Sequence, residues 1–351
     1  MFGLITVGVI VIVSLIIAWN TAMIKINTKH TYTLGIILCL FLVIVETFRD
    51  GTINPDFDLY LQYIIYPNSY KGDAEASFFK ISEYTYLFGG NYLTVFFIYA
   101  ILGISIKLYA IYRFSINIIY SICVWMSFSF ILHDLIQIRA AVAAALLLLM
   151  IPFVVQKKYW CAVSVWIIAI AFHNSALIFG FLFLLKKDTI RPWIWIGMYS
   201  LIFIINIVNY PIFSLIFKII ALFPSSLADR IGRSDPNVLN ELPRMTMYSR
   251  YVLIPAIFCL FALCYRKKLI SISPYSLVCL KSCFIGLYFY GIGLPIVSER
   301  VFELLSVPYI LLVPTSLFWF NKNSMIKGKV VITLFCLFMA WNLLFKQEVF
   351  S

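Results

Sequence analysis

The feature that most constrains the fold is a succession of apolar segments, each about as long as a bilayer is thick. A helix that crosses the hydrocarbon core needs about 20 apolar residues, and its backbone hydrogen bonds must be satisfied within the segment. Candidate spans lie near residues 2–20, 32–48, 92–111, 116–132, 135–155, 190–208, 248–265, 275–297, 304–320 and 329–345. With the further run 159–185, the chain is predicted to be an all-α polytopic integral membrane protein of about 11–12 transmembrane or half-membrane helices.

The composition excludes several classes of protein. Of the 351 residues, 63% are hydrophobic and 12% are charged, whereas soluble domains carry about 25% charged residues. Such a chain cannot cover a soluble surface with polar groups. Soluble enzymes, disordered proteins and nucleic-acid-binding proteins are therefore disfavoured despite the net charge of +12, and the expected surroundings are membrane lipids.

The N-terminus and the cysteines point to no processing or cross-linking. The first 20 residues have no basic segment and no small-residue cleavage site, so they are interpreted as a retained helix. The eight cysteines all lie inside apolar runs without the spacing of a metal site. We interpret them as small residues packed between helices.

The apolar run 159–185 is long for one span and short for two. Lysine pairs stand at both ends, at 157–158 and 186–187. The pairs favour a hairpin of two half-length helices that is broken near residues 172–175, and a single tilted span is the alternative. Positive residues gather in cytoplasmic loops, and the basic loops alternate along the whole chain only if this run crosses and returns.

This alternation also separates the polar residues. Lys107 and Lys281 are predicted to lie at cytoplasmic helix ends. Of the fifteen acidic residues, only Asp188 falls on the cytoplasmic side. The single domain, residues 1–351, is therefore expected to carry its polar chemistry on the outer side, where two larger loops lie at about 49–91 and 209–247.

Arg139 is the clearest candidate for a functional residue. It lies one turn into an alanine-rich apolar helix, and ionisable groups at membrane depth are costly and usually functional. An arginine there needs an anionic partner, either a ligand or a protein group. The alternatives are that its side chain reaches the interface, or that it pairs with Asp134 or with a loop acid.

His173 lies at the expected break of the hairpin, beside Asn174 and Ser175. An imidazole at this depth can act as a base or bind a phosphate. A packed, hydrogen-bonded core histidine is the equally weighted alternative.

Further arginines gather on the predicted outer side. Arginine binds phosphate bidentately and keeps its charge, so this clustering suggests an anionic ligand. An ordinary helical ion pair between Arg300 and Glu303 is the alternative for one of them. The set comprises Arg49, Arg139, Arg230, Arg233, Arg244, Arg250 and Arg300.

The order of these residues resembles the EpsG/Wzy-type family of polysaccharide polymerases. FRDGTINPDFDLYLQY is similar to an arginine–aspartate–tyrosine signature, which places Arg49, Asp56 and Tyr60 at its positions. The following segments resemble the family's later motifs and supply its glutamate, helix arginine, FHxSAL motif and late arginine. These residues are Glu75, Arg139, His173 with Ser175, and Arg300. Asn54-Pro55 stands where a glycine is expected before Asp56.

The resemblance implies a membrane glycosyltransferase that polymerises repeat units of O-antigen or a similar surface polysaccharide, as in lipopolysaccharide biosynthesis. Oligosaccharides linked to undecaprenyl diphosphate would be both donor and acceptor, and the active site would face the periplasm or exterior from the bacterial inner membrane. A chain-length co-polymerase is a candidate partner. No cofactor and no metal are expected, although Asp56 and Asp58 leave a divalent ion open.

Roles for the candidate residues follow from the chemistry that this reaction needs. Arg139 and Arg300, with Arg49 as a weaker candidate, would bind the diphosphate. Arg244, Arg250 and Tyr60 would also contact substrate. His173 is the leading base, and Glu75 or Asp56 is the second choice. Direct displacement would invert the anomeric carbon.

Other functions share parts of this pattern. A ligase that transfers finished glycan onto a lipid core uses the same chemistry. A flippase would carry charges in a cavity open to both sides, often with an internal repeat, and an O-acyltransferase would need a route from a cytoplasmic acyl donor. The one-sided charges and the short cytoplasmic loops favour the polymerase.

Overall fold

The computed structural model describes residues 28–49, 51, 56–70, 74–208, 246–293, 297–320 and 325–346, and every regular element among them is a helix. The predicted all-α class is therefore confirmed. The expected first span, most of the loop 209–247 and Arg244 lie outside the described residues.

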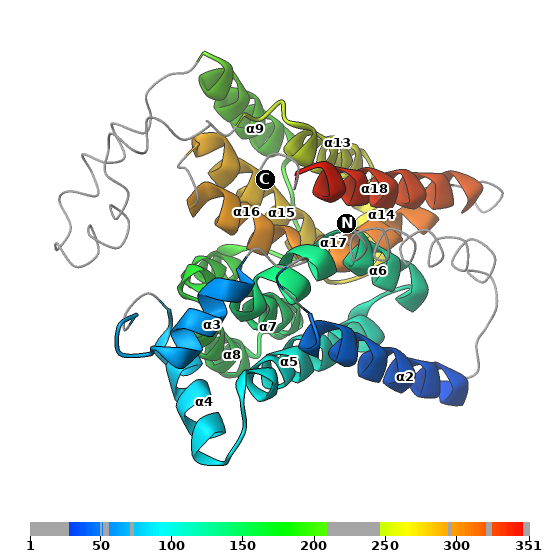
Figure 1. Cartoon of the computed structure of the whole chain (residues 1–351). Coiled ribbons are helices and arrows are strands. Elements are labelled where there is room, and N and C mark those ends of the chain that lie inside the picture. Colours follow the sequence, from blue (N-terminus) through cyan, green and yellow to red (C-terminus); the bar gives the residue numbers. More distant parts are fainter. Residues whose placement is uncertain are drawn as a thin grey trace.

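The first half of the chain forms helices on both sides of a central helix, α7 (Figure 1). Its elements are α2 (Thr28–Thr47), α3 (Phe57–Ile65), α4 (Ala76–Leu87), α5 (Tyr92–Phe114), α6 (Ile118–Val124), the π-helical η1 (Trp125–Ile136), α7 (Ile138–Val155), α8 (Tyr159–Phe172), the 3₁₀-helical η2 (Asn174–Leu184) and α9 (Pro192–Ile207).

The second half packs beside this group and completes the bundle, at the top and right of Figure 1. Its elements are α13 (Arg250–Cys264), α14 (Arg266–Ile272), α15 (Ser276–Ile292), α16 (Val297–Ser306), α17 (Tyr309–Leu312), the 3₁₀-helical η3 (Val313–Phe318) and α18 (Met325–Lys346).

Each predicted span within the described residues coincides with one helix or with consecutive helices. Among the described residues, five segments are long and apolar enough to cross a membrane, and further apolar helices are shorter. The long ones are Tyr92–Phe114, Ile118–Ile136, Ile138–Val155, Val297–Phe318 and Met325–Asn342. The chain is thus a multi-pass membrane protein.

The run 159–185 folds as the predicted hairpin. Helix α8 ends at Phe172, His173 is extended, and η2 begins at Asn174. Tyr159 is the first residue of the run and Phe183 lies near its last. Because their rings are only 6.4 Å apart, the two arms lie side by side and antiparallel. The Trp166 indole also donates a 3.0 Å hydrogen bond to the Ala176 carbonyl. The hairpin places His173 at its turn.

The alanines of α7 permit close packing in the centre of the bundle. A Cβ atom built on Gly103 of α5 would lie 3.5 Å from the Cβ of Ala141, so the two backbones approach closely. Small residues are what allow such approach between helices in a membrane. The start of α7, which carries Arg139, is therefore held firmly against α5.

Gly328 provides a test of the packing of α18. A Cβ atom there would lie 2.6 Å from the Ser316 carbonyl oxygen and 2.6 Å from the Leu317 Cα of η3. Because backbone atoms cannot move aside easily, Gly328→Ala is expected to destabilise the fold by about 1–3 kcal/mol. The loss would be measured as a lower thermal unfolding temperature in detergent.

Gly197→Ala is the matched control for that substitution. Gly197 also lies in a helix, α9, and a Cβ atom there meets nothing within 4 Å. Because alanine favours helix more than glycine does, this variant should be as stable as the wild type or slightly more stable. Equal unfolding temperatures for the two variants would contradict the packing argument.

Candidate functional site

The candidate site is built around Glu75, the residue that precedes α4. Its backbone is extended, with φ −66° and ψ 146°, and its carboxylate lies against residues of α7 and of the hairpin turn. One oxygen pairs with the Nη1 of Arg139. The other accepts hydrogen bonds from His173 Nδ1 at 3.1 Å and from the backbone N–H of Asn174 at 2.9 Å. Three segments far apart in the sequence therefore converge on one carboxylate.

The electrostatics of Glu75 fix the proton arrangement of His173. Burial acts to raise the pKa of Glu75, but the hydrogen bond from His173, the charge of Arg139 and the Asn174 N–H outweigh it and lower this pKa to about 2. The group is thus an ionised carboxylate at physiological pH, and an ionised carboxylate only accepts hydrogen bonds. His173 must therefore carry its proton on Nδ1, which leaves a lone pair on Nε2 when the imidazole is neutral.

The Nε2 atom of His173 is buried and has no hydrogen-bond partner among the described residues. A buried polar atom without a partner is unusual in native proteins and invites an explanation. A carboxylate that orients one imidazole nitrogen and leaves the other open is the arrangement by which enzymes prepare a general base.

Arg139 is held among aromatic rings. Its guanidinium carbon lies 5.7 Å from the ring centroid of Tyr60, 6.0 Å from that of Tyr63 and 5.9 Å from that of Phe78. Rings at these distances attract a cation and restrict its side chain. Of the partners considered from the sequence, the structure shows a loop acid, Glu75. Arg139 Nε has no hydrogen-bond partner among the described residues.

Asp56, Tyr60 and Arg300 adjoin this centre. Asp56 immediately precedes α3, which carries Tyr60. Burial raises the pKa of the Asp56 carboxyl, while the charges of Arg300 and Arg139 act in the opposite direction. Both arginines are therefore close enough to influence Asp56. Arg300 is exposed on α16, so it is the more accessible of the two.

Arg49 takes a different position from the one expected of a diphosphate ligand. Its side chain is buried, its Nη1 donates a 3.0 Å hydrogen bond to the Asp134 carbonyl oxygen, and its guanidinium lies 4.4 Å from the centroid of the Phe96 ring. Glu46 lies 3.6 Å away. These contacts tie Arg49 to the bundle and leave its Nε and Nη2 without hydrogen-bond partners among the described residues.

At the start of α13, Tyr251 is linked to the site by hydrogen bonds, whereas Arg250 faces outward. Arg250 is exposed. The neighbouring Tyr251 donates a 3.2 Å hydrogen bond to Glu303, which also accepts one at 3.3 Å from Gln137, two residues before Arg139. Glu303 is buried. It links α13 and α16 to the start of α7, a role that the sequence considerations did not assign to it.

The comparison with protein families decides the relationship of the chain. Residues 32–350 match the model of the EpsG family. The chain belongs to the EpsG family. Comparisons with curated proteins and with solved structures gave no match. Membership of the EpsG family implies a polysaccharide polymerase-type function in the membrane, and the match spans every residue of the Glu75 centre.

This EpsG-family chain also contains a buried ion pair that the sequence considerations misplaced. Lys107 was expected at a cytoplasmic helix end, but it is fully buried, and its Nζ lies 2.6 and 2.7 Å from the two carboxylate oxygens of Asp134. The Trp125 indole donates a further 2.9 Å hydrogen bond to Asp134. The predicted position at a helix end was wrong, because α5 continues past Lys107 to Phe114 and a buried acid lies within reach of the side chain.

Lys281, by contrast, contacts a segment that the sequence predicts to lie on the same side of the membrane. It is at the beginning of α15, and its Nζ donates to the backbone carbonyls of Lys186 and of Thr189, the latter at 2.6 Å. These residues belong to the segment predicted to share its side of the membrane.

The described residues of this EpsG-family protein contain no group of three His, Cys, Asp or Glu side chains that could hold a metal ion. Its eight cysteines are all unpaired.

Proposed function

We propose that this protein is a membrane glycosyltransferase that joins oligosaccharide repeat units carried on undecaprenyl diphosphate, at the outer face of the bacterial inner membrane. The product would be O-antigen or a similar surface polysaccharide. The observation that carries the proposal is the Glu75–His173 pair with the open Nε2, beside Arg139. Membership of the EpsG family supports it.

The reaction needs a base where the new bond forms. A hydroxyl of the acceptor sugar attacks the anomeric carbon of the donor, a carbon–oxygen bond forms, and the hydroxyl proton passes to Nε2 of His173. The developing imidazolium is stabilised by the Glu75 carboxylate, which already accepts from Nδ1 at 3.1 Å. Positioned general base catalysis contributes typically about 10²–10⁴-fold.

The leaving group needs positive charge. The bond between the anomeric carbon and the diphosphate oxygen breaks, and the diphosphate departs with the electron pair. Arg139 keeps donors beyond the Nη1 that binds Glu75, and Arg300 supplies an exposed guanidinium. Preorganised donors of this kind stabilise the charge that develops in a transition state. Arg49, tied to the Asp134 carbonyl, fits a supporting role better than direct binding.

Deletion of the gene in its host tests this function. We expect the ladder of long glycans on a gel to disappear while a single capped repeat unit survives, because export and ligation continue when polymerisation stops. The wild-type gene should restore the ladder. Loss of every glycan species, including the single unit, would instead favour a ligase or a flippase. An unchanged ladder with altered acetylation would indicate acyl transfer.

A further inference from the structure

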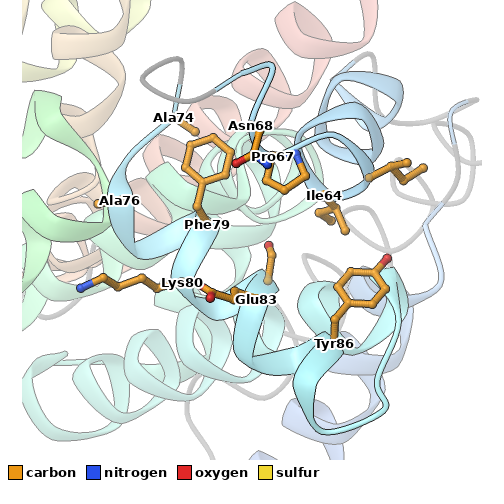
Figure 2. Close-up of a pocket in the computed structure, with 11 residues that line it drawn as sticks. Ile64, Pro67, Asn68, Ala74, Ala76, Phe79, Lys80, Glu83 and Tyr86 are labelled. Carbon is orange, nitrogen blue, oxygen red and sulfur yellow. The ribbon is translucent and has the colours of Figure 1, made fainter.

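A second feature lies beside the Glu75 centre and has no part in the proposed chemistry. Between α3 and α4 is a cavity of about 970 Å³, which Figure 2 shows with the residues that line it. This is at the upper end of the range for small-molecule pockets, about 300–1,000 Å³. In Figure 2, Phe79, Pro67 and Asn68 lie along the top, Ile64 and Tyr86 lie on the right, and Glu83 lies below Phe79 on α4.

Helix α4 lies between this cavity and the packed interior, and its N-terminus is next to Glu75. Phe78, Ser82 and Thr85 are the buried residues of α4, and of these Ser82 also lines the cavity. Phe79, Glu83 and Tyr86 follow at helical spacing on the face that lines the cavity. Ala74 and Ala76, which flank Glu75, also line it. A ligand in the cavity would therefore begin at the N-terminus of α4, next to the candidate catalytic pair.

The lining indicates the chemistry of the ligand. Among the described residues that line it, it carries one ammonium group, Lys80, one carboxylate, Glu83, and no arginine. This differs from the centre that contains Arg139 and does not suit a diphosphate. The carboxylate and the Asn68 amide match hydroxyl groups, and the rings of Phe79 and Tyr86 offer apolar faces. Apolar walls with a few polar groups are typical of pockets for polar organic ligands.

We propose that this cavity binds the sugar portion of a lipid-linked repeat unit, as an uncharged oligosaccharide held between α3 and α4. The proposal rests on the proposed function and deepens it. It divides the substrate between two regions: the diphosphate lies by the arginines, and the glycan extends along α4. The hydroxyls bond to Glu83 and Asn68, and the sugar rings lie against Phe79 and Tyr86.

Binding of a delipidated sugar tests this proposal directly. The probe is the repeat-unit oligosaccharide released by mild acid from the lipid-linked pool of the host, titrated against the purified full-length protein in detergent. Tyr86→Ala and Glu83→Gln should each weaken binding about five- to tenfold, as expected for the loss of one contact of about 1 kcal/mol. Tyr84→Ala is the matched control, because Tyr84 lies on the same helix, is 59% exposed and does not line the cavity.

A second probe separates the glycan from the lipid. Dodecyl diphosphate, which carries no sugar, should bind the wild type, Tyr86→Ala and Glu83→Gln equally. If the two variants instead lose this probe and keep the oligosaccharide, the cavity holds the lipid and the proposal is overturned. Wild-type affinity of both variants for the oligosaccharide, with unchanged unfolding temperatures, would also overturn it.

Failure of the proposed function would look different. In that case deletion of the gene would leave the glycan ladder intact or would remove every glycan species, whatever the variants of the cavity do. A ladder that disappears on deletion, together with normal oligosaccharide binding by Tyr86→Ala and Glu83→Gln, would contradict the cavity alone.

Discussion

Replacement of His173 by alanine is expected to stop chain extension while the protein remains folded. The substitution removes the nitrogen whose lone pair faces no partner among the described residues and that we assign to accept the hydroxyl proton. The expected loss is about 10²–10⁴-fold in the rate of polymerisation, the usual contribution of a positioned base. The rate is measured as the appearance of long glycans in the deletion strain, at equal amounts of membrane-inserted protein.

His30→Ala provides a control of the same residue type. His30 lies near the beginning of α2 and has no place in the proposed mechanism. This variant should restore the full ladder. Wild-type polymerisation by His173→Ala would remove His173 from the mechanism and leave the second choice of base, Asp56, to be tested.

Glu75→Gln separates the role of the carboxylate from that of the imidazole. The amide can still accept from His173 Nδ1, but it carries no charge to stabilise the imidazolium or to balance Arg139. We expect a partial loss of rate, smaller than that of His173→Ala. Glu75 itself was a candidate base, but a carboxylate whose pKa is lowered to about 2 and that already accepts three contacts has little tendency to take a proton.

Much of the fold was predictable from the sequence because span length is set by the bilayer. The hairpin at 159–185 followed from the lysine pairs at its ends and was confirmed by α8 and η2. Helix α3 (Phe57–Ile65) was not expected, because its nine residues are too few to show a clear period within a polar loop. The predicted single domain and the predicted sides of the membrane stay predictions.

The sequence identified residues that belong to the site but not which of them contact one another. Sequence order supplied His173, Glu75 and Arg139, and the structure joins them through contacts across 64 and 98 positions of the chain. No local pattern reports which loop acid reaches a given arginine. The sequence therefore could not show which loop acid, Glu75 or Asp56, pairs with Arg139, and the structure shows that it is Glu75. Arg49 shows the same limit, since its hydrogen bond, beside the ion pair with Glu46, goes to the Asp134 backbone carbonyl, which has no sequence signal.

The ion pair of Lys107 and Asp134 illustrates why buried charges were misassigned. Helices buried on every side, such as η1, show no polar face from which the position of a charge can be read. Both side chains are completely inaccessible, so each one makes the burial of the other tolerable. Asp134 also presents its backbone carbonyl to Arg49, which connects the pair to the rim of the candidate site.

Breaking this pair is therefore expected to destabilise the bundle strongly. Lys107→Met leaves Asp134 as an uncompensated buried charge, and Asp134→Asn does the same for Lys107. Removal of one partner of a buried pair costs about 3–5 kcal/mol. Thermal unfolding in detergent, followed by the loss of the monodisperse peak in gel filtration, measures the change, and Lys158→Met, at an exposed lysine, should behave as the wild type.

The double variant Lys107→Met/Asp134→Asn decides whether the charges matter as a pair. It removes both charges, and replacing a buried pair by uncharged groups is often close to neutral. We expect it to unfold at a higher temperature than either single variant, because the penalty of each single change is the isolated charge that it leaves behind. If instead the two losses add, the residues contribute independently and the ion pair does not account for their burial. If the double variant is stable but extends glycans slowly, the pair serves to hold Arg49 and the adjoining Tyr60 in place for the reaction.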